Sequence, residues 1–198
     1  MFLKNKISFI SFYVFLFFFS SFKIHAETVN KTNILNYLKS LKYFSASFIQ
    51  NDGISLSEGK LYIGKDRIRV EYLLPTKILI ILDENKAMYY DYELEEDEFF
   101  NPKNTDAWFL YEIFSNPNFL SDSSMGIKKN EIKLKKSGFD NERGDYLINI
   151  FFENRPLNLR GFEVKIGENY LKISIYNHKY NQNFDKDFFK LINPSFLS

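Results

Sequence analysis

Residues 67–75 read RIRVEYLLP, and this stretch decides the fold class. Ile68, Val70 and Tyr72 alternate with charged neighbours, which is the period of a strand that buries one face and solvates the other. Pro75 ends the run, because a proline cannot donate to the hydrogen-bond ladder of a sheet. Such a strand favours an antiparallel sheet, and the apolar side of that sheet needs a cover.

The same period of two continues on both sides of this stretch. Strand-like runs lie near residues 43–50, 60–63, 77–82, 87–92, 131–136, 146–152, 160–166 and 170–176. Turn signals such as Asn51-Asp-Gly53 and Gly167-Glu-Asn169 separate neighbouring runs. Residues 77–82 are apolar on both faces, which predicts a strand that is covered on both sides. Together the runs predict one continuous β-meander with helical interruptions.

Two segments have a helical period instead. Apolar side chains three and four residues apart predict a short amphipathic helix over residues 32–41, capped by Asn30 or Thr32. A second helix is predicted over residues 106–114, and it is apolar around its whole circumference. A helix of that kind is buried, or it covers something apolar.

The first 26 residues are predicted to be a signal peptide. Lys4 and Lys6 give a basic start, residues 7–22 are uncharged and apolar, and Ala26 occupies the cleavage position. The apolar run is short for a permanent anchor, which needs roughly 20 residues, although an uncleaved anchor is the alternative. We expect residues 27–198 to form a single exported domain.

Composition excludes several classes of partner and site. Once residues 1–26 are removed, basic and acidic residues nearly balance, so no general attraction to nucleic acid is expected. The chain has no cysteine. That absence excludes disulfides, thiolate metal sites and a lipid-modified N-terminal cysteine.

The residues that could carry covalent chemistry are few. His178 is the single histidine outside the predicted signal peptide, so a histidine triad has no partners, and we expect an ordinary surface residue there. Gly53 and Gly59 lie one residue too far apart for a phosphate loop, and Leu61 stands where Ser or Thr is needed. The acidic residues 93–98 are read as a solvated hairpin end, with a calcium site or a basic partner as the alternative. We therefore predict a protein that is not an enzyme, with no catalytic residues, no metal and no cofactor.

The excess of apolar faces allows two interpretations. A curved sheet with an apolar concave face and an apolar helix can enclose a hydrophobic cavity beneath a lid. The same side chains can also simply fill a core. The pattern by itself does not separate the two.

Eight short segments, in order, resemble the periplasmic outer-membrane lipoprotein carriers, the LolA-like family. They read YFSASFIQ at residues 43–50, GKLYI at 59–63, RVEYLLP at 69–75, ILIIL at 78–82, DEN at 83–85, MYYD at 88–91, TDAWFL at 105–110 and FDKDFF at 184–189. Their order and spacing carry the resemblance, since each segment is short. The outer-membrane receptor of these carriers is itself a lipoprotein, so a chain without cysteine is more similar to the soluble carrier.

The resemblance implies an α+β, β-rich fold: a strongly curved, incomplete antiparallel β-barrel (a half-barrel) with helices covering its concave apolar face. It implies a monomeric periplasmic chaperone whose hydrophobic cavity takes the acyl chains of lipid-modified proteins. An inner-membrane lipoprotein-releasing transporter would load it, and an outer-membrane lipoprotein receptor would unload it. Within that fold, strand parity places five residues on the acyl-cavity face and leaves two lid candidates on the second helix. The cavity residues are Leu61, Ile63, Ile68, Val70 and Tyr72, and the lid residues are Leu110 and Phe114.

One departure from the family pattern concerns the latch of the lid. The family has an arginine, usually before a proline, that hydrogen-bonds the lid closed. The matching position here is Lys65, which lacks the planar fork of arginine, and Arg67 is the second candidate for the role.

Two other functions stay open at this point. The same fold could carry or sense another amphiphile, such as a glycolipid or a phospholipid, without lipoprotein transfer. It could also serve as an interaction module with a filled core, as in relatives that regulate envelope-stress signalling.

Overall fold

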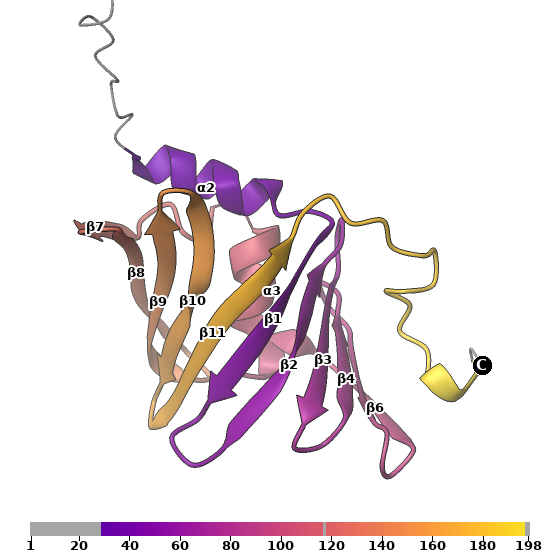
Figure 1. The fold of residues 1–198 in the computed structure, drawn as a ribbon. Coiled ribbons are helices and arrows are strands. Elements are labelled where there is room, and N and C mark those ends of the chain that lie inside the picture. Colours follow the sequence, from indigo (N-terminus) through magenta and orange to yellow (C-terminus); the bar gives the residue numbers. More distant parts are fainter. Residues whose placement is uncertain (1–28, 117, 197–198) are drawn as a thin grey trace, which may run out of the picture.

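The computed structural model describes residues 29–116 and 118–196 (Figure 1). Its main element is one curved sheet of 11 strands in which every neighbouring pair is antiparallel. The sheet is open, with β6 at one edge and β7 at the other. The predicted fold class, a β-rich incomplete barrel with helices on its concave side, is confirmed. The predicted signal peptide lies outside the described residues.

The first half of the chain forms six strands joined by hairpins. They are β1 (Phe44–Asn51), β2 (Leu56–Ile63), β3 (Ile68–Leu74), β4 (Ile78–Leu82), β5 (Ala87–Asp91) and β6 (Glu96–Phe100). The turn between β1 and β2 falls at the predicted position, where Asp52 accepts backbone hydrogen bonds from Ile54 and Ser55 at 2.9 and 2.8 Å. The acidic run does contain a hairpin end, but its last residues continue into β6, which the sequence did not predict.

The second half forms five strands. They are β7 (Ser124–Lys128), β8 (Glu131–Asp140), β9 (Gly144–Asn154), β10 (Leu157–Ile166) and β11 (Asn169–Lys179). β11 pairs with β1, so that Ile175 lies opposite Phe48. The prediction of one continuous meander is therefore wrong. Two meanders meet at the first and last strands, because the connection through α3 carries the chain from the β6 edge to the β7 edge.

Two α-helices lie on the concave side of the sheet, α2 (Lys31–Ser40) and α3 (Trp108–Ser115). Asn30 caps α2 in a reciprocal capping box with Asn33. α3 begins two residues later than predicted, after the short 3-10 helix η2 (Pro102–Asn104). Figure 1 shows α2 across one end of the strands and α3 behind β1 and β11. In the part of the chain described here, no helix is long and apolar enough to span a membrane.

The main hydrophobic core fills the space between these helices and the concave face. α2 contributes Ile34 and Leu38, and α3 contributes Phe109 and Ile113. Alternate residues of the strands face them, as the buried Leu61 and Ile63 of β2 illustrate. Packing against these apolar side chains explains why a helix as apolar as α3 is stable here.

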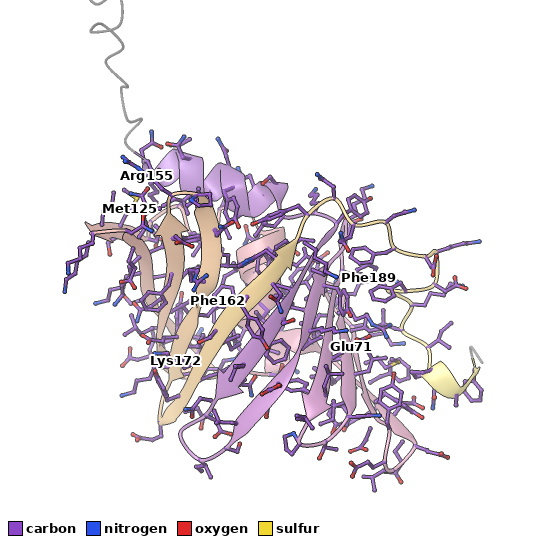
Figure 2. All side chains as sticks on the ribbon, in the orientation of Figure 1. Glu71, Met125, Arg155, Phe162, Lys172 and Phe189 are labelled. Atoms are coloured by element: carbon purple, nitrogen blue, oxygen red, sulfur yellow. The ribbon has the colours of Figure 1, made fainter. Side chains whose placement is uncertain are left out.

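The C-terminal segment, residues 180–196, covers part of the convex face. Leu79 and Ile81 of β4 point to this side and are 1% exposed, in a cluster that Leu191 completes. The prediction that residues 77–82 are covered on both sides is thus confirmed. Arg69 fixes the segment, donating to the carbonyl oxygen of Phe188 at 2.7 Å. Figure 2 labels Phe189 where this segment, which ends in the 3-10 helix η3 (Pro194–Phe196), passes the sheet.

His178 is not the ordinary surface residue that the sequence predicted. Its ring is half-buried, with Nε2 2.6 Å from the carbonyl oxygen of Leu159. It also stacks on Tyr180 with a ring-centroid distance of 6.3 Å. This placement gives the histidine a structural role, because it links the end of β11 to the start of β10.

Candidate functional site

An apolar cavity of about 150 Å³ lies between the concave face of the sheet and the first half of α3. We call it the acyl cavity, after the ligand that the sequence analysis predicts for it. Strands from both halves of the sheet and one helix supply its apolar walls: Phe48 of β1, Leu61 of β2, Val70 of β3, Phe162 of β10, Leu171 and Ile173 of β11, and Phe109 and Leu110 of α3. The cavity therefore depends on both meanders at once.

The predicted cavity residues divide into two groups. Leu61, Val70 and Tyr72 line the acyl cavity. Ile63 and Ile68 belong to the same buried core, but they are not among the residues that line this cavity. All five lie on one side of the sheet because they share the parity of their strands. Their role in binding an acyl chain stays a prediction.

The two lid candidates contact different parts of the interior. Leu110 lines the acyl cavity itself. Phe114, one turn later, packs edge-on against Phe162 with a ring-centroid distance of 6.0 Å. Phe162 also meets Phe109 at 6.3 Å, so one ring of β10 supports α3 at two successive turns.

Polar groups occupy one part of the cavity wall. Tyr72 donates a hydrogen bond of 2.8 Å from its hydroxyl to Oε1 of Gln50, and both side chains line the cavity. Burial raises the pKa of Tyr72 to about 12, because the phenolate would lose its hydration. Asp106, just before α3, also contributes to the lining. A ligand with a polar end would find hydrogen-bonding partners here.

Contacts at the start of α3 hold the helix over the cavity. Oδ2 of Asp106 accepts a 3.0 Å hydrogen bond from Asn169, the first residue of β11. The Trp108 ring lies between Phe119 and Tyr146, at 5.4 and 5.3 Å. The guanidinium of Arg143 lies 5.3 Å from the Trp108 ring. The start of α3 is thus fastened to two hairpin ends of the second meander.

A further contact ties α2 to the loop that follows α3. The ammonium of Lys31 donates to the carbonyl oxygens of Ser121 and Ser123, at 2.5 and 2.6 Å. These two bonds join the start of one helix to the exit of the other.

The latch candidates lie after β2, near the turn that leads to β3. Arg67 bonds Oδ2 of Asp83 at 2.7 Å through Nε. Its Nη1 donates to the carbonyl oxygen of Phe189 at 3.0 Å. These partners belong to the turn after β4 and to the C-terminal segment. Lys65 is exposed. A latch role for either residue stays a prediction.

Several residues of the site were not identified from the sequence. Phe48, Phe162 and Ile173 reach the cavity because β1 pairs with β11, and no local pattern encodes that pairing. Asp106 and Asn169 meet across 63 positions of sequence. The alternation of apolar and polar residues in β10 and β11 indicates that Phe162 and Ile173 point to the apolar side of the sheet. This alternation is the signal from which they could have been assigned to the cavity.

The lining of the acyl cavity suits the binding of an apolar ligand. Among the described residues, no three His, Asp or Glu side chains gather as a metal site. The walls of the acyl cavity are mainly hydrocarbon and aromatic surface, which stabilises an apolar ligand by removing its surface from water.

Comparison with known proteins identifies the relatives of this chain. A family model described as outer membrane lipoprotein carrier protein LolA matches residues 39–192. The uncharacterized protein RP864 of Rickettsia prowazekii (strain Madrid E) is 26% identical over 197 residues, covering 98% of this chain and 91% of that protein.

Two solved structures resemble the fold at low identity. The crystal structure of an uncharacterized conserved protein from Thermus thermophilus has a TM-score of 0.51 and 9% identity, covering 81% of this chain and 94% of that one. A crystal structure of MucB has a TM-score of 0.48 and 9% identity, covering 83% of this chain and 63% of that one. At such identities the first likeness concerns the fold alone. The family match spans most of the sequence, and the chain belongs to the LolA family of outer membrane lipoprotein carrier proteins.

Proposed function

We propose that this protein is a periplasmic carrier that holds the acyl chains of lipid-modified proteins between the concave face of its sheet and α3. The observation that carries the proposal is an apolar cavity beneath a helix, in a chain of the LolA family. An inner-membrane lipoprotein-releasing transporter would load the carrier, and an outer-membrane lipoprotein receptor would unload it. The carrier acts by binding and release, without covalent chemistry.

The size of the acyl cavity supports a role for α3 as a lid. The cavity holds about 150 Å³, and an apolar cavity of about that size accommodates a molecule such as benzene. A long acyl chain therefore enters only after α3 moves away from the sheet. Leu110 and Phe114 would leave their contacts with the cavity wall and with Phe162 in that step.

The energetics favour a carrier that can also release its cargo. Burial of a 16-carbon chain gains on the order of 12 kcal/mol, at about 0.8 kcal/mol for each methylene. Three such chains would exceed the practical affinity limit of roughly 18–21 kcal/mol. Opening the packed lid consumes part of this gain, because the rings of Phe109 and Phe114 must separate from Phe162. The net affinity falls into a range in which a receptor can compete.

Native mass spectrometry of the protein, recovered from a periplasm that produces lipoproteins, tests this proposal. We expect a triacylated protein bound one to one, and we expect the complex to be lost in the variant Val70→Glu. Recovery of the wild-type protein empty, together with failure to take up an apolar dye, would contradict the proposal.

A carrier of another amphiphile, such as a glycolipid or a phospholipid, is the second candidate. Gln50, Tyr72 and Asp106 favour it, since they add hydrogen-bonding groups to an otherwise apolar wall. Lipid extraction of the same sample separates the two candidates. Free glycolipid or phospholipid in place of acylated protein would support this second function.

A further inference from the structure

The last turns of α2 and α3 enclose a second hollow, separate from the acyl cavity. We call it the α2–α3 groove. It has a volume of about 330 Å³, and its floor and walls are mainly apolar: Leu35, Leu38, Ile113, Phe114 and Leu120. It shares no lining residue with the acyl cavity in the part of the chain that the structure describes. Its volume falls in the range of small-molecule sites, roughly 300–1,000 Å³.

Two lysines form the charged rim of the groove. Lys39 lies in the last turn of α2, and Lys42 follows the helix after the C-cap residue Leu41. Neither ammonium has a hydrogen-bond or ion-pair partner within residues 29–116 and 118–196. The negative end of the α2 dipole stabilises the positive charge of Lys39. Lys42 lies beyond the helix, so the dipole does not explain a positive charge there.

The charge of this rim sets the groove apart from its neighbour. No acidic side chain lines the groove among the residues described. On another face of α3 a cleft of about 550 Å³ is lined by charges of both signs: the carboxylates of Glu84, Glu112, Asp140 and Glu142, and the cations of Lys103 and Arg143. α3 therefore separates a cleft of mixed charge from an apolar groove whose rim carries only cations. A ligand that fits the groove is apolar along most of its length and negative at one end.

Phe114 stands between the α2–α3 groove and the acyl cavity. Its ring lines the groove and packs on Phe162, whose ring lines the cavity. The Phe114 and Phe162 rings thus lie between the groove and the acyl cavity.

We propose that the α2–α3 groove binds a long-chain fatty acid, with its carboxylate between Lys39 and Lys42 and its chain along Leu35 and Phe114. The proposal depends on the proposed function only in that the interior accepts an acyl chain. The apolar floor supplies the attraction for the chain, and the two lysines select an anionic end over a neutral one.

Equilibrium binding of palmitate and of methyl palmitate to the whole mature protein tests this proposal. The two probes have the same chain, but only palmitate carries a charge. We expect the wild-type protein to prefer palmitate by roughly three- to tenfold at low salt, the range that two exposed ion pairs provide. The variant Lys39→Gln/Lys42→Gln should bind both probes with equal affinity. Because both lysines are exposed, the substitutions leave the core intact.

The matched control is Lys77→Gln/Lys165→Gln, which removes the same charge at two exposed lysines outside the groove. It should keep the preference for palmitate. Equal binding of the two probes to the wild-type protein, or an unchanged preference in Lys39→Gln/Lys42→Gln, would overturn the groove proposal alone. If neither probe binds, the acyl-carrier function fails with it.

Discussion

Phe48 and Gly59 face each other across β1 and β2, and the Phe48 ring occupies the space that a Cβ atom at position 59 would need. The same ring meets Tyr72 edge-on, with 5.2 Å between the ring centroids. Phe48 and Tyr72 both line the acyl cavity. The Phe48 ring can thus form one wall of the cavity only because residue 59 has no side chain.

Replacement of Gly59 by alanine should destabilise the protein and disturb this wall. The added methyl group would overlap the carbonyl oxygen of Glu71 and the Phe48 ring, so the backbone or the ring has to shift. We expect a loss of about 1–3 kcal/mol, as for other overpacked cores, measured as a lower urea midpoint. Gly126→Ala is the matched control, since its new Cβ would meet nothing within 4 Å. Equal midpoints for the two variants would contradict this account.

A charge at position 110 should empty the acyl cavity. Leu110→Glu places a carboxylate at a half-buried position in an apolar wall, and an apolar ligand in contact with this charge would take away part of its hydration. Uptake of the neutral dye N-phenyl-1-naphthylamine should fall by roughly tenfold or more, while circular dichroism stays that of a folded β-protein. Leu94→Glu serves as the control, because Leu94 is 67% exposed. Unchanged dye uptake by Leu110→Glu would show that the dye does not bind in the acyl cavity.

Release of α3 at its start should speed the entry of ligands. Asn169→Ala removes the hydrogen bond to Asp106, and one such bond contributes about 0.5–1.5 kcal/mol. If the bond breaks before a ligand enters, the uptake rate in stopped-flow mixing should rise by roughly two- to tenfold. Asn130→Ala removes an exposed amide–carboxylate bond to Glu153, away from α3, and should leave the rate unchanged. A rate for Asn169→Ala equal to that of the wild type would show that this bond does not limit opening.

Tyr72 should make stability fall at high pH. Burial raises its pKa to about 12 in the folded protein, above the value of 10.0 for a free tyrosine. The folded state therefore holds the proton more tightly, so this contribution is complete below about pH 10 and is lost as the pH rises towards 12. Between about pH 8 and pH 11, Tyr72→Phe should lose less stability than the wild type in urea titrations. Tyr170→Phe, at an exposed tyrosine, should follow the wild type.

The sequence allowed the inward face of the sheet to be predicted, because strand parity is a local property. Leu61, Val70 and Tyr72 were assigned to one face from alternation alone, and they meet in one cavity wall. The helical period likewise located α2 and α3 to within about two residues, the usual uncertainty of helix ends. These features depend on neighbours in sequence, so a single chain reveals them.

The features that were missed depend on distant partners. β6 and β7 lack a clean apolar alternation, since β6 begins with three acidic residues and β7 contains Gly126. They become strands because β5 and β8 offer free edges to pair with. The pairing of β1 with β11 and the packing of Leu191 on the convex face are long-range as well. No local pattern could predict them.

The central position of β1 and β11 has a consequence for the timing of folding. During synthesis from the N-terminus, β1 is made long before its partner β11, because Phe48 pairs with Ile175 near the other end of the domain. Non-local pairings of this kind form slowly, because the entropy cost of closing a long loop comes before the contacts that offset it. The two meanders therefore stay unjoined until nearly the whole polypeptide is available. Such late closure would delay assembly of the acyl cavity until the C-terminal strands of the sheet have been made.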